Sequence, residues 1–148
     1  MKEQLEIQHI VPYLPFGLKA HDEEYGETFF VCSYRQDSDE WLIHDNIDGS
    51  VIEYSRDVLK PILRPLSDLT KEIEHNGEKF TPCLILFPFE EFDDLIGQDS
   101  KTYAEGFIRS NNRLELSYPL FFWTKLYEWH FDVFGLIEKG LAISYNNL

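Results

Sequence analysis

Residues 41–54, with the sequence WLIHDNIDGSVIEY, decide what kind of fold this chain can form. The dipeptide Asp48-Gly49 lies between two β-prone segments, and it is a strong hairpin signal because both residues tolerate a positive φ. The alternation counted from this turn predicts a buried face made of Trp41, Ile43, Ile47, Ile52 and Tyr54. The opposite, solvent-facing side would carry His44, Asn46 and Glu53.

The segments that precede this hairpin extend it into a sheet. Residues 18–21 and 27–34 also have the composition of strands, so we expect an N-terminal antiparallel meander of four strands, a small barrel-like sheet. Such a sheet needs a helix packed on it. The strongest helix is predicted from Pro119 to about Val133, with proline at the first position and aromatic residues on most sides. The expected fold is α+β, with the meander packed on this C-terminal helix, in a single domain over residues 1–148.

Shorter elements fill the rest of the chain. Residues 3–10 favour a short helix, and the two prolines of residues 60–66 favour an extended crossing segment. Residues 83–87 fit either a buried strand or the lead-in to a helix. We predict a helix from Ser67-Asp68 to Asn76-Gly77 and an amphipathic helix over residues 89–96 that Gly97 ends. A hairpin over 107–116, a helical turn over 135–140 and an edge strand over 141–145 complete the prediction.

The amino-acid composition excludes several classes of function. The 148 residues are 43% apolar and 16% aromatic, which is enough for a core and too much for a disordered acidic tail. A formal net charge of -14 makes a DNA-, RNA- or membrane-binding surface unexpected, because such surfaces need Lys and Arg. The polar start of the chain lacks the pattern of a signal peptide, and the longest apolar run, residues 83–89, is too short to span a bilayer.

The excess negative charge is confined to two windows. Residues 21–53 contain ten acidic residues and one base, residues 90–99 contain five acidic residues and no base, and the remainder is neutral overall. A device for solubility alone would be spread more evenly. We therefore predict a partner-binding surface made of Asp22, Glu23, Glu24, Asp37, Asp39, Glu40, Asp45, Asp48, Glu90, Glu91, Asp93 and Asp94. The sequence leaves open whether the two windows share one face.

Two carboxylate-rich segments invite a metal-binding interpretation. Residues 44–55 are similar to a calcium-binding loop, but His44 stands at its first position and Ser55 at its twelfth, where Asp and Glu are needed. The hairpin is favoured there. The carboxylates of residues 90–94 can converge only at a spacing of three or four on a helix, so a solvated acidic face is favoured over a catalytic pair. We expect no metal and no cofactor.

The histidines and cysteines give no catalytic pattern. The five histidines share no metal-ligand spacing, and His130 is expected to be a core histidine of the aromatic helix. Cys32 and Cys83 are expected to be buried free thiols, and nothing in the sequence around Cys83 supports a nucleophile–base pair with His130. The sequence also lacks a phosphate-binding glycine loop and a nucleophile elbow. We expect a protein that is not an enzyme.

Three segments carry a family resemblance: YLPFGLK at residues 13–19, KPILRPLSDL at 60–69 and HFDVFGLIEKGLA at 130–142. They resemble short uncharacterised proteins encoded by phages and prophages of Bacteroides-like bacteria. The last segment is the most specific, and in it Val133-Phe134 replaces the Tyr-Arg pair of the usual pattern. The match covers 30 of the 148 residues. The resemblance implies a phage or prophage origin and a shared scaffold, and it supplies no activity and no site residues.

Three functions remain open from the sequence. The first is a non-enzymatic acidic protein that occupies a basic, nucleic-acid-binding site on a host protein, such as a CRISPR effector or another defence nuclease, and thereby inhibits it. The alternative is a phage structural or replication-accessory protein without an inhibitory role, and the third is an unrecognised small enzyme. In the first two cases we expect a cytoplasmic protein of the bacterial host cell.

Overall fold

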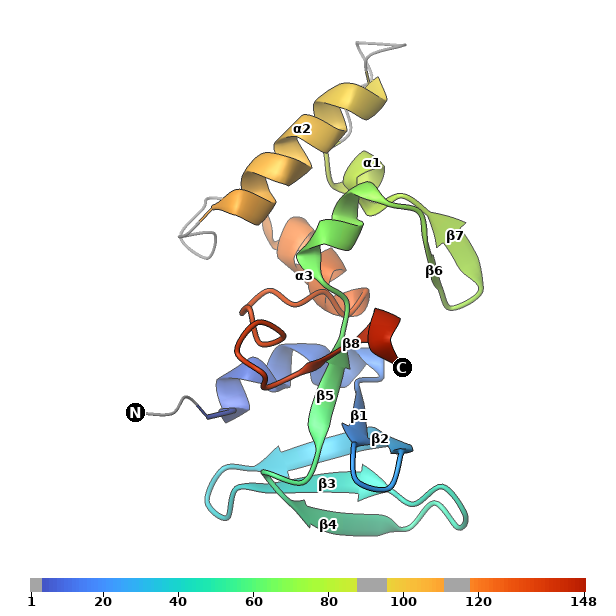
Figure 1. Ribbon diagram of the computed structural model, residues 1–148, viewed down its shortest axis with the longest axis vertical. Helices are drawn as coiled ribbons and strands as arrows, with labels where there is room; N and C mark the ends of the chain where they lie inside the picture. The colour runs from blue at the N-terminus through green and yellow to red at the C-terminus, as the bar shows by residue number, and fades with distance from the viewer. Residues whose placement is uncertain (1–3, 88–95, 111–117) are drawn as a thin grey trace.

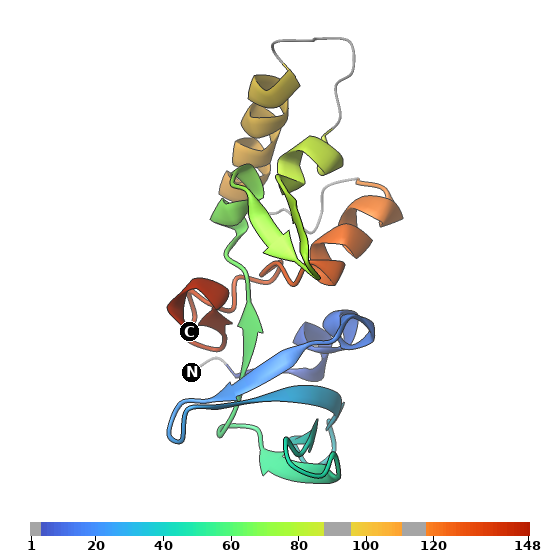
Figure 2. The ribbon, with the colours of Figure 1, turned by 90° about the vertical axis from the view of Figure 1, so that its right-hand side faces the viewer.

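The computed structural model describes residues 4–87, 96–110 and 118–148. Figure 1 and Figure 2 show two lobes, a sheet at one end of the molecule and a group of short helices at the other. The strand order of the main sheet is β4-β3-β2-β1-β5-β8, and all neighbours are antiparallel except the parallel pair β5–β8. The predicted α+β class and the N-terminal four-strand meander are confirmed. The strands are β1 (Lys19–Asp22), β2 (Glu27–Arg35), β3 (Glu40–His44), β4 (Val51–Ser55), β5 (Lys60–Leu63) and β8 (Ile143–Ser144).

The hairpin β3–β4 exists, but its turn differs from the prediction. Trp41 pairs with Tyr54 and Ile43 with Ile52, so the predicted register of the buried face is correct for these four residues. The strands are joined by residues 45–50 and not by a two-residue Asp48-Gly49 turn. Within this longer loop the strand alternation is lost, and Ile47 is 96% exposed although the alternation predicted it to be buried.

Strand β2 is long enough for its two halves to pair with different neighbouring strands. Its first half, residues 27–30, pairs with β1, and its second half, residues 31–35, pairs with β3, with a bulge between Val31 and Ser33. A bulge bends a strand and increases its twist. The sheet therefore curls around the side chains on its inner face.

A single apolar cluster fills the inner face of the sheet. Its fully buried members include Trp41 and Ile43 from the hairpin and Leu18 beside β1. The 3-10 helices η1 (Ile7–His9) and η2 (Val11–Phe16) contribute flanking residues, and Leu136 and Ala142 come from the C-terminal segment. Burial of each large side chain contributes about 1.5–3 kcal/mol. The cover of the sheet is thus supplied mainly by irregular segments from both ends of the chain.

A second apolar cluster holds the helical lobe together. It contains Cys83 from α1, Phe107 from α2 and Phe122 from α3, and Tyr127 and Phe134 pack against both clusters. The rings of Tyr118 and Phe122 stack at 4.1 Å. The elements of this lobe are η3 (Leu66–Thr70), β6 (Ile73–His75), β7 (Glu78–Phe80), α1 (Pro82–Leu86), α2 (Ile96–Arg109) and α3 (Leu120–Glu128). None of these described helices is both long and apolar enough to cross a membrane.

The aromatic helix is confirmed but is shorter than predicted. Pro119 is the residue before the first helical turn of α3, and the helix ends at Glu128 and not near Val133. His130, which was expected within the helix, has a φ of 62° and turns the chain out of it. The following Phe131 then forms a parallel bridge with Arg64.

Several other elements in this half of the chain correct the prediction. The segment predicted as a helix over 67–77 is η3 followed by the hairpin β6–β7, and Asn76 and Gly77 form its turn with φ values of 52° and 83°. Residues 107–109 belong to α2 and not to a hairpin, and Gly97 lies inside that helix. Residues 135–140 form turns without a helix, whereas the predicted edge strand near the C-terminus is present as β8. The predicted helix over 89–95 and the strand over 114–116 lie outside the described residues.

Buried polar groups join the two lobes. The hydroxyl of Tyr13 donates to the carbonyl of Phe131 at 2.5 Å and accepts from the amide of Val133 at 3.2 Å. The backbone of Arg64 exchanges hydrogen bonds with His130 and Asp132. These contacts bring together residues 13–19, 60–69 and 130–142, and we call this region the junction.

Candidate functional site

The strand topology divides the first acidic window between the two ends of the meander. In an antiparallel meander alternate loops share an end, so the β1–β2 and β3–β4 loops lie at one end and the β2–β3 loop at the other. Figure 1 shows the first two loops toward the right of the sheet and the third at the left. The five residues of β3 separate the two ends by about 17 Å. We call the end with two loops the acidic end.

The β1–β2 loop is ordered by a carboxylate that faces inward. Asp22 is only 3% exposed, and its Oδ1 accepts hydrogen bonds from the backbone amides of Glu24 and Tyr25. Glu23 forms an ion pair with Lys60 at 2.8 Å. Glu24 remains exposed at the tip. Asp22 therefore shapes the loop and is removed from the predicted set of surface carboxylates.

The β3–β4 loop is ordered in the same way. Asp45 Oδ1 accepts from the amides of Ile47 and Asp48 at 2.8 and 3.1 Å, and Asp48 Oδ1 accepts from the amide of Ser50 at 2.9 Å. Hydrogen bonds from Ser50 lower the pKa of Asp48, so this exposed carboxylate stays ionised. Both loops thus present their acidic residues on a fixed backbone.

The two loops lie in one electrostatic environment. Asn46 Nδ2 donates to the carbonyl of Thr28 at 3.0 Å, which ties the β3–β4 loop to the start of β2. The pKa of Tyr54 is raised, mainly by burial and further by the negative charges of Glu27, Asp22 and Asp45. Carboxylates from both loops therefore act on the same hydroxyl, that of Tyr54, so the charges of the two loops lie near one another.

Two large apolar side chains project from these acidic loops. Tyr25 in the β1–β2 loop is 73% exposed, and Ile47 in the β3–β4 loop is 96% exposed. Val51 follows at the start of β4 and is also exposed. Single exposed apolar residues are ordinary, but each of these loops places one beside ionised carboxylates. This arrangement matches the anchor residues and charged rim of a protein interface.

The opposite end of the meander is also acidic in sequence but is partly neutralised by two arginines. Arg35 pairs with Glu53 at 3.0 Å, and Arg56 pairs with Asp39 at 3.2 Å and with Asp57 at 3.8 Å. Three carboxylates there share two guanidinium groups. This end therefore offers a basic partner less uncompensated charge than the acidic end.

The structure brings together only part of the predicted binding set. At the acidic end it places Glu23, Glu24, Asp45 and Asp48, together with Glu27, which the prediction had not included. Asp37, Asp39 and Glu40 lie at the other end and do not join them. Glu90, Glu91, Asp93 and Asp94 lie outside the described residues. The prediction had treated residues 21–53 as one acidic window, and the sheet divides that window between two separate surfaces.

Sequence reasoning missed the apolar part of this site. Ile47 was assigned to the buried face because the Asp48-Gly49 dipeptide suggested a short turn, and Tyr25 was not considered. The sequence did contain one usable signal: Asp45, two residues before Ile47, is a residue type that caps its own loop and interrupts a strand. A loop beginning at Asp45 would have placed Ile47 in solvent.

Cys32 and His44 form a close pair of titratable side chains on the sheet. Cys32 Sγ lies 2.8 Å from His44 Nε2, and His44 Nδ1 is 3.3 Å from the carbonyl of Gly49. Burial raises the pKa of the Cys32 thiol, so the neutral thiol is favoured. Both thiols were predicted to be buried. Cys83 is buried, but Cys32 is only half-buried. Among residues 4–87, 96–110 and 118–148 no cluster of three or more His, Cys, Asp or Glu could hold a metal ion.

Comparison with known proteins assigns nothing to this surface. No protein-family model, curated protein or solved structure matches the chain. The chemistry of the acidic end must therefore be judged from its geometry. Ionised carboxylates on fixed loops can pair with Lys and Arg side chains of another macromolecule, and the two apolar side chains can enter pockets between them.

Proposed function

We propose that the protein is a non-enzymatic binding protein of phage or prophage origin whose acidic end docks on a basic, nucleic-acid-binding site of a host protein. The observation that supports it most strongly is the pair of rigid loops that present carboxylates together with Tyr25 and Ile47. The target class is a host nuclease or defence complex, such as a CRISPR effector. By occupying its basic cleft, the protein would keep DNA or RNA out.

Charge complementarity selects the class of partner. Clefts that bind nucleic acid are lined with Lys and Arg, and an uncompensated group of carboxylates is complementary to them. At physiological salt such charges act over about 8 Å, so the carboxylates must be gathered on one surface to act together. The acidic end satisfies this requirement, since its loops carry Glu23, Glu24, Asp45 and Asp48 and its nearest base is Lys60.

Apolar contacts would supply affinity that charge alone does not. Removing the Ile47 side chain from water contributes about 1.5–3 kcal/mol, and Tyr25 adds a ring of the type enriched at interface hot spots. Both side chains are exposed in the unbound protein, so little has to be rearranged before they make contact.

Preorganised loops lower the entropic cost of binding. The carboxylates of Asp22 and Asp45 each accept two backbone amides of their own loop, which fixes the positions of Tyr25 and Ile47 before a partner arrives. Ordering a flexible segment on binding would oppose association by the entropy lost. Asp22 is therefore a buried support of the docking surface, whereas Asp45 both orders its own loop and adds its charge to that surface.

A panel experiment tests the proposal. Purified protein is added to host CRISPR effectors, restriction enzymes and other nucleic-acid-binding complexes, and binding is measured by interferometry at 50 and 300 mM salt. We expect a complex with at least one member that weakens as salt rises and that competes with the member's own DNA or RNA. Absence of any salt-sensitive complex, or a complex that forms equally well on the nucleic-acid-loaded target, would contradict the proposal.

A pair of apolar variants separates docking from general stickiness. Ile47→Ser removes the exposed anchor of the acidic end, and Leu120→Ser removes a side chain that is 80% exposed on α3 in the other lobe. We expect Ile47→Ser to weaken the complex about tenfold or more, which corresponds to roughly 1.4 kcal/mol, and Leu120→Ser to leave it unchanged. Circular dichroism and thermal unfolding confirm that both variants are folded.

A further inference from the structure

A second group of charged side chains lies between the lobes, far from the acidic loops. A hollow of about 270 Å³ opens beside the junction, and basic side chains from four separate segments reach it. Its basic members are Lys19 from β1, Arg64 after β5, His75 from β6 and His130 after α3. The protein carries a net charge of -14, so a gathering of bases is the exception on this molecule. We call this hollow the interlobe pocket.

Arg64 forms the inner wall of the pocket and is 5% exposed. Its Nε donates to the carbonyl of Trp129 at 3.2 Å, one terminal nitrogen donates to the carbonyl of Glu74 at 2.7 Å, and its guanidinium lies 4.3 Å from the centre of the Tyr145 ring. These contacts fix the group. Burial lowers the pKa of Arg64, and the negative charge of Asp68 opposes that shift without forming an ion pair with it. No acidic side chain of the described residues forms an ion pair with it.

Lys19 supplies the second fixed positive charge. Its ammonium lies 5.1 Å from the centre of the Phe30 ring, and it forms no ion pair with an acidic residue in the described part of the chain. Among 27 acidic residues, a partly buried lysine without an acidic partner is an unusual arrangement. Lys19 is the first residue of β1, whereas the acidic end lies beyond the last residue of that strand.

The two histidines show that these bases face the same space. Their rings pack edge to face with centres 5.3 Å apart, and His130 Nε2 lies 2.6 Å from the carbonyl of Phe16, to which it donates, so Nδ1 is left as an acceptor. Burial, together with the positive charges of His75, Arg64 and Lys19, lowers the pKa of His130 to about 4, against the opposing effect of the hydrogen bond to Phe16. Burial and the charge of Arg64 also lower the pKa of His75.

We infer that the interlobe pocket is a binding site for a small oxyanion of the phosphate type. Two cations without acidic partners would gain a counterion from it, and the arginine fork suits the oxygens of a phosphate. The volume lies just below the roughly 300–1,000 Å³ that is typical of pockets for drug-sized ligands, so the ligand is small. Phe16, Phe30 and Tyr145 add apolar surface beside these charges, which strengthens charge interactions relative to open water.

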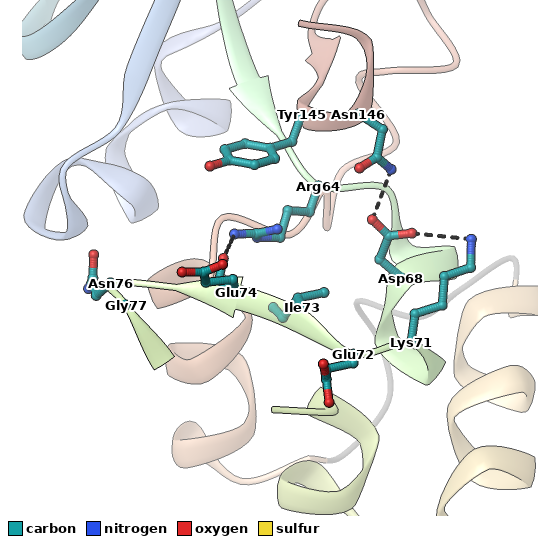
Figure 3. A pocket seen from close by; sticks show the side chains of 10 residues that line it. All are labelled: Arg64, Asp68, Lys71, Glu72, Ile73, Glu74, Asn76, Gly77, Tyr145 and Asn146. Atoms are coloured by element: carbon teal, nitrogen blue, oxygen red, sulfur yellow. Dashed lines mark hydrogen bonds and ion pairs between the residues drawn. The ribbon is translucent and has the colours of Figure 1, made fainter. Parts of the chain in front are cut away.

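The neighbouring hollow shows why the anion belongs on the Lys19 side. Figure 3 shows this second hollow, of about 620 Å³, which shares Arg64, Glu74, Asn76 and Tyr145 with the interlobe pocket. Asp68, Glu72 and Glu74 line it, and its lysine, Lys71, already pairs with Asp68 at 3.5 Å. Three carboxylates there would repel an anion, whereas Glu74 is the only acidic residue in the described lining of the interlobe pocket.

Inorganic phosphate is the probe that tests this inference. The native protein is titrated with phosphate at pH 7 and constant ionic strength, with sodium chloride making up the difference, and both thermal unfolding and ¹H–¹⁵N NMR spectra are recorded. We expect a saturable rise in Tm above that in chloride, and shifts of the amides around Lys19 and His130. No rise beyond the chloride control, or shifts confined to other regions, would overturn the inference.

Matched lysine variants locate the site. Lys19→Gln removes a charge that forms no ion pair with the described residues, so the fold should be kept, and Lys79→Gln removes an exposed charge of β7 outside the pocket. We expect Lys19→Gln to weaken phosphate binding about tenfold and Lys79→Gln to leave it unchanged. Equal affinity in both variants would place the phosphate elsewhere and contradict the inference. Equal Tm values in chloride alone show that both variants are folded.

Discussion

Tyr13 is the residue on which the contact between the lobes depends most directly. Its hydroxyl serves the carbonyl of Phe131 and the amide of Val133, both of which are buried. Burial raises the pKa of Tyr13 well above its ordinary value, so the hydroxyl keeps its proton and remains a donor at neutral pH. One side chain therefore satisfies two backbone groups of a segment more than a hundred residues away.

The first prediction concerns this hydroxyl. Tyr13→Phe should lower the free energy of unfolding by about 1–3 kcal/mol, because two buried backbone groups lose their partner. Urea denaturation measures the change. Tyr25→Phe is the control, since Tyr25 is exposed, and it should stay within about 0.5 kcal/mol of the original protein. A Tyr13→Phe protein as stable as the control would show that the junction does not depend on this bond.

The second prediction concerns the pH dependence that His130 imposes. Its pKa is 6.5 in a model peptide and about 4 in the folded protein, so between these values the unfolded chain binds more protons than the native one. Stability from this group is therefore complete above pH 6.5 and falls, by about 3 kcal/mol in all, as the pH drops toward 4. Denaturation at a series of pH values measures it.

A variant isolates this contribution from that of the carboxylates. Asn tolerates the positive φ of residue 130, so His130→Asn removes the titration but keeps the backbone. The Asn amide is too short to replace the hydrogen bond from His130 Nε2 to Phe16, and that loss lowers stability equally at every pH. We expect a shallower fall in stability between pH 6.5 and 4 than in the original protein. Parallel pH profiles for the two proteins would show that His130 is not buried in its neutral form.

At the scale of elements, the sequence predicts periodic segments well and turns poorly. The register of β3 and β4 and the start of α3 after Pro119 follow from alternation and from the fixed φ of proline. Asn76-Gly77 was interpreted as a helix stop although this dipeptide favours a two-residue hairpin turn, which is what it forms. Helix α2 was missed because its polar residues and Gly106 hide a pattern that only the packing of Ala104 and Phe107 reveals.

The third prediction compares two glycines in these elements. Gly77 has a φ of +83° in the β6–β7 turn, whereas Gly106 lies in α2 without a positive φ, and neither has an atom near the position of an added Cβ. Gly77→Ala should therefore destabilise the protein by about 1–2 kcal/mol, because Ala is strained at that φ. Gly106→Ala should stabilise it by about 0.4–1 kcal/mol, because the unfolded chain loses freedom. Thermal unfolding measures both, and shifts of the same sign would contradict the turn geometry.

At the scale of the whole molecule, the proposed function depends on which loops share an end. The sequence located the excess charge correctly but not in space, because the positions of Glu24 and Asp37 depend on the lengths and order of four strands. The interlobe pocket was also beyond sequence reasoning, since Lys19, Arg64 and His130 are distant along the chain and meet only at the junction. Local sequence patterns do not predict which residues that are distant along the chain come together in the fold.

The docking of the acidic end on a basic host site is tested most directly by two charge-reversal variants of equal net charge. Glu24→Lys with Glu27→Lys changes exposed residues of the acidic end, and Asp37→Lys with Asp57→Lys changes exposed residues of the opposite end. The measurement is the dissociation constant of each variant for the nucleic-acid-binding complex that the panel identifies. We expect the first variant to bind at least about tenfold more weakly than the second, which should stay close to the original protein. Equal weakening of both, or a greater loss in the second, would contradict docking through the acidic end.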